Sequence, residues 1–223
     1  MSPAPHLIDA LLTGSAPADS AVTSVFWELV GPVPLRTGRV VACDPLADPR
    51  DLPFTRVAPV GTFPVELLIA RHGEDDGADQ RVAAAVWRFG PEPLGGDPPT
   101  IWEPAVIAGQ DVESLRPGEF YGYGVDAGVG GFMGDDAARA LLARMDAEDD
   151  YYERVIEATD QNYRHTRSWA VVRPDEADPD AAVALFSSGY GDGAYGSWWG
   201  LAADGRVLCV VTDFGLLGSG ANE

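Results

Sequence analysis

Short runs of hydrophobic residues, broken by clusters of Pro, Gly and Asp, follow one another through most of the chain. Runs rich in Val, Phe and Trp with such turn-forming breaks are typical of β-strands. The segments predicted as strands are residues 22–30, 38–43, 57–70, 81–89, 101–108, 168–173, 181–187, 194–202 and 206–214. Strands this short and this closely spaced favour a predominantly antiparallel sheet, either curled or folded into a sandwich.

One region has the periodicity of a helix. Its apolar residues recur at spacings of three and four and share one helix face: Ala138, Leu141, Leu142 and Met145. We predict one or two helices over about residues 135–158. Asp135 or Asp136 suits the N-cap, because a carboxylate accepts hydrogen bonds from the unpaired amides of the first turn. The acidic run at residues 148–150 is expected to end or interrupt the helix.

The last two predicted strands indicate where the C-terminal part of the chain lies. Residues 207–211 are all apolar, so this strand is expected at the centre of a sheet, covered on both faces. The Asp204-Gly205 pair between the two strands is typical of a two-residue type I′ hairpin turn.

Length and pattern together favour one domain. A chain of 223 residues is long for one domain and short for two, but a central C-terminal strand ties the chain into one core. We therefore interpret residues 1–223 as a single α+β domain, with residues 1–20 as an N-terminal helix or extension. The Pro- and Gly-rich stretch at residues 90–100 is predicted to be a surface connection.

The charge of the chain narrows its function classes. Thirty-five acidic residues against 15 basic ones give a formal net charge of −20, and every basic residue is arginine. Such a field repels a polyanion, so no nucleic-acid partner is expected. Without lysine, the phosphate-loop, Schiff-base and kinase-type chemistries are excluded. An acidic surface of this strength favours a basic protein partner.

Cysteine usage and the length of the apolar runs bear on location. Cys43 and Cys209 each lie inside an apolar run, which predicts buried thiols and no disulfide. The chain has no run of 18 apolar residues and no signal-like N-terminus, so we expect a cytoplasmic protein without membrane association. The oligomeric state stays open.

Several aspartates lie within or beside glycine-rich segments or next to an aromatic residue, and we take them as the candidate catalytic residues: Asp126, Asp135, Asp192 and Asp213. If they converge, Asp126, Asp192 and Asp213 would ligate a divalent metal, with Asp135 as a ligand or base. Such a site suits a metal-dependent hydrolase, for instance of phosphoesters. Alternatively, each carboxylate caps a turn or a helix.

Two further patterns concern ligands. Gly191, Gly193 and Gly196 match the spacing of a dinucleotide-binding loop, but the chain continues as a strand where that loop needs a helix, so no nucleotide cofactor is expected. Tyr195 and Trp199 lie on the same predicted strand. Core packing is their favoured role, and a stacking surface in a small-molecule pocket is the alternative.

A set of short motifs occurs in order along the chain: Cys43-Asp44-Pro45-Leu46, Gly61-Thr62-Phe63-Pro64-Val65, Trp102-Glu103-Pro104-Ala105, Val125-Asp126-Ala127-Gly128, Ser188-Gly189-Tyr190-Gly191-Asp192-Gly193 with Tyr195, and Asp213-Phe214. With these motifs, residues 36–214 resemble a bacterial family known as domain of unknown function 4241. The resemblance implies that Asp44, Asp126, Asp192 and Asp213 occupy recurrent motif positions, which adds Asp44 to the ligand-pocket candidates. It implies no activity.

Three functional hypotheses follow. The first is a non-catalytic cytoplasmic binding or regulatory module, comparable to small immunity proteins, whose acidic surface binds a basic protein. The second is the metal-dependent hydrolase, and the third is a small-molecule sensor with Tyr195 and Trp199 in its pocket.

Overall fold

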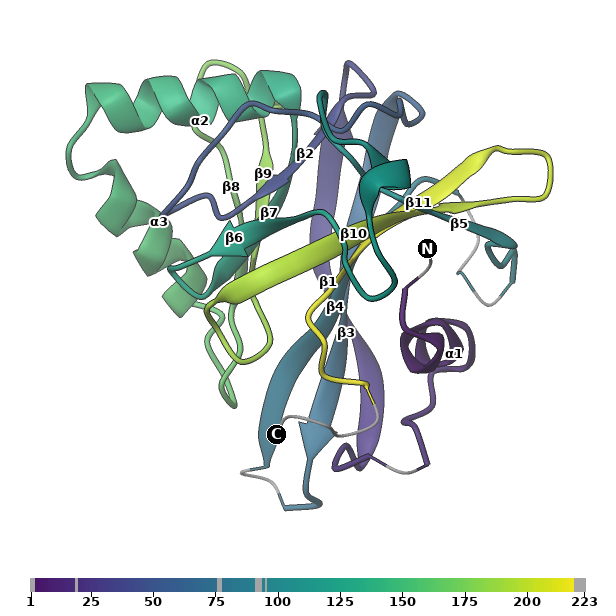
Figure 1. The fold of residues 1–223 in the computed structure, drawn as a ribbon. Helices are drawn as coiled ribbons and strands as arrows, with labels where there is room; N and C mark the ends of the chain where they lie inside the picture. The colour runs from purple at the N-terminus through teal and green to yellow at the C-terminus, as the bar shows by residue number, and fades with distance from the viewer. Residues whose placement is uncertain (1–2, 19, 76–77, 91–93, 95, 219–223) are drawn as a thin grey trace.

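The computed structural model describes residues 3–18, 20–75, 78–90, 94 and 96–218, and its strands form two open antiparallel sheets (Figure 1). In spatial order, the larger sheet contains β1 (Ser24–Leu35), β3 (Gly61–His72), β4 (Asp79–Arg88), β11 (Val207–Asp213), β10 (Gly193–Leu201) and β5 (Ile101–Pro104), with β6 (Gly122–Val125) also paired to β10. The smaller sheet contains β2 (Val40–Cys43), β7 (Val129–Gly134), β9 (Val183–Ser187) and β8 (Trp169–Val172). The helices are α1 (Pro5–Thr13), α2 (Asp135–Ala147), α3 (Tyr151–Asp160) and the short 3-10 helix η1 (Val112–Ser114). The predicted α+β class and the antiparallel sheet are confirmed.

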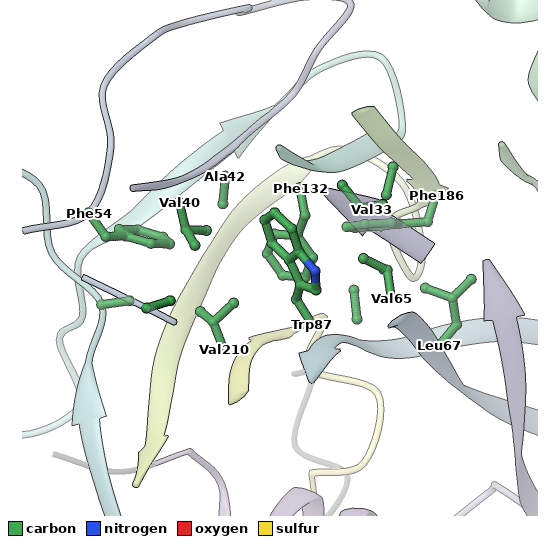
Figure 2. Close-up of a cluster of buried hydrophobic side chains, with 14 of the residues drawn as sticks. Val33, Val40, Ala42, Phe54, Val65, Leu67, Trp87, Phe132, Phe186 and Val210 are labelled. Carbon is green, nitrogen blue, oxygen red and sulfur yellow. The ribbon is translucent and has the colours of Figure 1, made fainter. Parts of the chain in front are cut away.

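The two sheets pack face to face, with helices on both outer sides. Figure 2 shows the centre of the core between them, where Trp87 of β4 stacks on Phe132 of β7 with ring centroids 6.2 Å apart. Helix α1 packs on the outer face of the larger sheet, and α2 and α3 pack on the outer face of the smaller one (Figure 1). Burying each large apolar side chain stabilises the fold by roughly 1.5–3 kcal/mol.

The centre of the larger sheet follows the apolar pattern closely. Strand β11 lies between β4 and β10, and residues 207–212 are buried. The predicted central position of this strand is confirmed. Strand β3 begins at Gly61 and not at Val57, because its partner β1 ends at Leu35, which pairs with Gly61.

The glycine-rich segment before the helical region forms two strands that the hydrophobic pattern had not indicated, β6 and β7. Gly130 of β7 allows the chain to pass close to the smaller sheet's own aromatic side chains. A Cβ added at Gly130 would lie 2.9 Å from the ring of Phe186. Close packing therefore explains why residues with no side chain occupy a buried strand.

The helical region divides as the acidic run predicted. Helix α2 ends at Ala147, and α3 begins at Tyr151. The N-cap of α2 is Gly134, so Asp135 and Asp136 lie in the first turn and neither is the cap. Their charge still suits the positive end of the helix dipole.

The prediction of a type I′ turn at Asp204-Gly205 is wrong. That turn needs positive φ at both central residues, but among the described non-glycine residues only His165 and Thr166 have it. Of the two predicted turn residues, only Gly205 has a positive φ, of 84°. Its amide donates to the Ala202 carbonyl at 2.9 Å. The hairpin therefore closes through a longer loop that contains one left-handed glycine.

Three predictions concern the remaining segments. The N-terminal helix is α1, although residues 1–2 and 19 of the predicted extension lie outside the described residues. Residues 91–93 and 95 of the predicted connection at 90–100 also lie outside them. Cys43 and Cys209 are buried free thiols, as expected.

Within the described part of the chain, no helix has both the length and the apolar character needed to cross a membrane.

Candidate functional site

Three of the motif segments, those that contain Asp44, Asp126 and Asp192, meet where the end of β6 and the start of β10 lie side by side. Asp44 is at the centre of this contact. Its side chain has no exposed surface. One carboxylate oxygen accepts from the amides of Leu46 at 2.9 Å and Ala47 at 3.0 Å. The other accepts from the amides of Asp126 at 2.9 Å and Ala127 at 2.8 Å. Asp44 therefore ties the loop after β2 to the loop after β6, which lies about 80 residues away.

The turn before β10 is tied to the same place by Tyr195. The Tyr195 hydroxyl lies 2.8 Å from the Gly191 carbonyl and 3.2 Å from the Ser188 carbonyl, and it can donate to either. The Ser188 amide donates to the Gly128 carbonyl at 3.1 Å, which joins this turn to the loop after β6. Burial raises the pKa of Tyr195, and the nearby Asp192 carboxylate raises it further. The tyrosine therefore stays protonated as a donor.

The structure brings two of the predicted metal ligands together. In the register of β6 and β10, Val125 pairs with Gly193, so Asp126 and Asp192 are the next residues outward on the two strands. The two loops touch there, because a Cβ at Gly128 would lie 3.9 Å from the Cα of Gly191. Both carboxylates are exposed.

Asp213 has its partners elsewhere. It follows Val211 at the spacing that places both on the outer face of the larger sheet, towards α1. Its carboxylate accepts from the Gly215 amide at 2.8 Å and from the Ala4 backbone at the start of α1. Burial raises the pKa of Asp213, and these two hydrogen bonds oppose the rise.

Asp135 is also held by its own set of partners. Its carboxylate accepts from the Thr37 hydroxyl at 2.6 Å and from the Arg139 guanidinium at 3.1 Å, and Arg39 lies 3.6 Å away. Burial raises the pKa of Asp135, but the bonds from Thr37 and Arg139 outweigh it and lower the pKa overall. Over the described ranges, no group of three or more His, Cys, Asp or Glu residues is placed to hold a metal ion.

Trp199, a predicted pocket residue, is part of the core. It is 1 % exposed, and its ring packs against Phe54 at 5.9 Å and Phe89 at 6.3 Å between centroids. It also lines the base of an open groove of about 630 Å³ beside the ion pair of Arg56 and Glu103. A stacked ligand would have to displace one of these aromatic neighbours.

Sequence reasoning missed a buried cation, Arg167, which links the two sheets. This side chain bonds to Gln80 of β4 at 2.8 Å and to Glu28 of β1 at 2.9 Å, and its residue is 2 % exposed. Burial lowers the pKa of Arg167, and Glu28 opposes this shift. The adjacent His165 and Thr166 have φ of 50° and 74°, a backbone strain that no sequence pattern reveals.

A second candidate site is an acidic surface at the junction of α2 and α3, residues 146–160, which we call the acidic elbow. It carries one basic residue, Arg154, which pairs with Glu148. Six of its acids are exposed: Asp146, Asp149, Asp150, Glu153, Glu157 and Asp160. Beside them lie two exposed tyrosines, Tyr152 at 42 % and Tyr163 at 61 %. The acidic run was visible in the sequence, but it was interpreted only as a helix end.

Comparison with known proteins gives one finding. A family model described as "Protein of unknown function (DUF4241)" matches residues 33–212. No curated protein and no solved structure matches the chain.

Proposed function

We propose that this chain, which belongs to the DUF4241 family, is a non-catalytic cytoplasmic binding or regulatory module whose acidic surface binds a basic protein partner. The observation that carries the proposal is the acidic elbow. Its six exposed acids form no ion pair with any described residue of the chain. These carboxylates remain available to lysine and arginine side chains of another protein.

The acidic elbow combines charged and aromatic side chains. This combination suits a protein interface better than charge alone would. Exposed ion pairs contribute only about 0.2–1 kcal/mol each, so several carboxylates mainly steer a basic partner and set its orientation. Tyr152 and Tyr163 provide aromatic surface of the kind that supplies much of the binding energy at protein interfaces. The formal net charge of −20 extends the attraction beyond the contact itself.

The motif residues described above have structural roles, which supports placing the binding surface at the elbow and not at the motifs. Asp44 and Tyr195 use their hydrogen-bonding groups to join loops of this chain. We infer that these motif residues maintain the fold and that the elbow makes the contact with the partner. A cytoplasmic location fits the two free thiols, which are both buried.

A second candidate function, metal-dependent hydrolysis, has one observation in its favour, the adjacency of Asp126 and Asp192. It would be tested by thermal unfolding in EDTA and then with Mg²⁺, Mn²⁺, Ca²⁺ or Zn²⁺, because a ligand specific to the folded state raises the midpoint. A rise with one ion that is lost in both Asp126→Asn and Asp192→Asn would replace the binding proposal with this one.

The test of the binding proposal uses a fluorescently labelled oligolysine peptide as the basic probe and measures its anisotropy. One variant neutralises the elbow with Asp149→Asn, Asp150→Asn, Glu153→Gln and Glu157→Gln. A matched control neutralises four exposed acids elsewhere, with Asp9→Asn, Asp51→Asn, Glu113→Gln and Glu176→Gln. Both variants have a formal net charge of −20 + 4 = −16.

We expect the elbow variant to lose about tenfold in affinity for the probe and the control about twofold or less. Salt screens charges that lie more than a Debye length from the bound probe, so remote substitutions have little effect. Binding of the wild-type protein should weaken as salt rises. Equal losses in the two variants would mean that the probe senses net charge alone, and the elbow would then not be the binding surface.

A further inference from the structure

Strand β1 is an edge strand with an unpaired side. It is 12 residues long and pairs with β3 along one side. Among the strands that the structure describes, none pairs with its other side. Such an edge presents a row of amide and carbonyl groups to any strand that reaches it.

Only part of this edge is suited to pairing. The ladder with β3 is interrupted by a bulge between Leu29 and Gly31. Beyond it, Pro32 and Pro34 have no amide hydrogen to donate. The smaller sheet also approaches at this point, because a Cβ at Gly31 would lie 3.2 Å from Val171. The part of the edge before Gly31 and the two prolines is therefore residues 24–30, in which Val30 is the bulged residue. The midpoint of this open part is Trp27.

The open part lacks the charges with which proteins usually protect an edge strand. Its one charged residue, Glu28, is paired with the buried Arg167. Two of its exposed side chains are large and apolar, Trp27 at 38 % and Leu29 at 56 %. On the neighbouring strand, Glu66 is paired with Arg88 at 2.5 Å.

This local neutrality decides between possible partners. A basic segment finds no unpaired carboxylate along residues 24–30, whereas it finds six at the elbow. A second copy of the chain, which also carries −20 charges, is repelled over most of its surface but can approach along a neutral apolar strip. The strip complements itself, as a two-fold interface requires.

We propose that β1 pairs antiparallel with β1 of a second copy about a two-fold axis, which joins the two larger sheets into one. With the axis at the midpoint, Trp27 lies opposite the partner's Trp27, and Leu29 lies opposite the partner's Val25. This inference goes beyond the proposed function and does not depend on it. The acidic elbow lies on helices that pack over the smaller sheet, whereas this dimer uses the larger one.

The first experiment measures the dimer dissociation constant by sedimentation equilibrium. Leu29→Glu places a new charge on the edge. Ile101→Glu is the matched control, because Ile101 is 40 % exposed on β5, the strand at the opposite end of the same sheet. We expect Leu29→Glu to raise the dissociation constant at least tenfold and Ile101→Glu to leave it within about twofold, as for a remote charge.

Salt separates this inference from the proposed function. Raising NaCl from about 0.01 M to 1 M shortens the Debye length from about 30 Å to 3 Å. The dimer should strengthen, because the repulsion between two anionic copies is screened, whereas binding of the basic probe should weaken. A protein that stays monomeric in 1 M NaCl at roughly 500 μM, well above the micromolar range of weak specific complexes, would overturn the dimer and leave the binding proposal standing. A dimer lost equally in both glutamate variants would also overturn it.

The register has its own test. Trp27→Cys should give a disulfide-linked dimer under mild oxidation, because directly opposed residues in an antiparallel pair have Cα atoms about 4.5–5.5 Å apart, within disulfide range. Ile101→Cys should remain monomeric on a non-reducing gel, and the native thiols are buried. A dimer of the wild-type protein without a Trp27→Cys cross-link would contradict the two-fold axis at residue 27.

Discussion

Asp44 and the acids of the elbow are the same kind of side chain in opposite environments. Asp44 is fully buried and receives four amide hydrogen bonds, whereas Asp149 is exposed and forms no ion pair with a described residue. A charge removed from water is stable only when hydrogen bonds replace its hydration. The buried acid is therefore committed to the fold, and the exposed acids remain free for another molecule.

The largest effect should come from Asp44→Ala, which removes the acceptor of four amides. Hydrogen bonds to a charged group contribute about 1.5–3 kcal/mol each, and part of this loss is recovered by water. We expect the free energy of unfolding to fall by about 3 kcal/mol or more and Tm to fall by roughly 10 °C. Urea and thermal unfolding monitored by circular dichroism would measure both.

The control for this prediction is Asp149→Ala in the elbow, which should change the free energy of unfolding by about 0.5 kcal/mol or less. Asp44→Asn should fall between the two, because an amide side chain retains one acceptor oxygen. The contrast between the two environments breaks down if Asp44→Ala is no more destabilising than Asp149→Ala.

A smaller effect is expected from Tyr195→Phe, which keeps the ring against Phe214 but removes the hydroxyl that ties the turn before β10. One neutral hydrogen bond contributes about 1 kcal/mol, so Tm should fall by about 3 °C. Differential scanning calorimetry would detect this change. An unchanged Tm would show that the turn is held by its backbone bonds alone.

Asp135 lies between the two extremes, because cations and a hydroxyl replace part of its hydration. Its pKa is lower in the folded state than its ordinary value of 3.8. The unfolded chain therefore binds more protons, and the stabilisation is present above pH 3.8 and is lost as the pH falls through the folded-state pKa. Asp135→Asn should cost about 1 kcal/mol at pH 7.

Urea unfolding of both proteins from pH 7 to pH 2.5 would measure this dependence. The curves of wild-type protein and Asp135→Asn should converge at the acidic end. A difference that stays constant over the whole range would assign the effect to packing and not to the charge of Asp135.

The smallest effect is expected from neutralising four elbow acids. Each exposed substitution changes the free energy of unfolding by about 0.5 kcal/mol or less, and relief of repulsion in a chain with −20 charges should make the sum slightly stabilising. The gain should fade in about 1 M NaCl, where the Debye length is about 3 Å. A destabilisation that persists in salt would mean that the elbow acids support the helices.

Features of the fold that depend on the polarity of individual side chains could be predicted from the sequence. The apolar run of β11 predicted a central strand, and the acidic run at residues 148–150 predicted the break between α2 and α3; both are confirmed. Strands β6 and β7 escaped prediction because glycine adds no hydrophobic period to the pattern.

Contacts between distant segments could not be predicted in the same way. Asp44 was a candidate for a ligand pocket, and its actual partners, the amides of Asp126 and Ala127, carry no signal in the sequence because every residue type has such an amide. The strained His165-Thr166 turn likewise depends on Gln80 and Arg167, which hold it in place. The candidate aspartates were visible as a set, but only the strand register decides that Asp126 meets Asp192.

The position of β11 also affects how the protein is made. This strand, residues 207–213, fills the gap between β4 and β10. A ribosome releases the chain from its N-terminal end. After β4 has emerged, about 120 further residues must therefore be synthesised before its second partner strand, β11, can pair with it. The two halves of the larger sheet can assemble earlier only as separate pieces, and a transcript cut short before codon 207 would leave both with an open hydrophobic edge for chaperones and proteases to recognise.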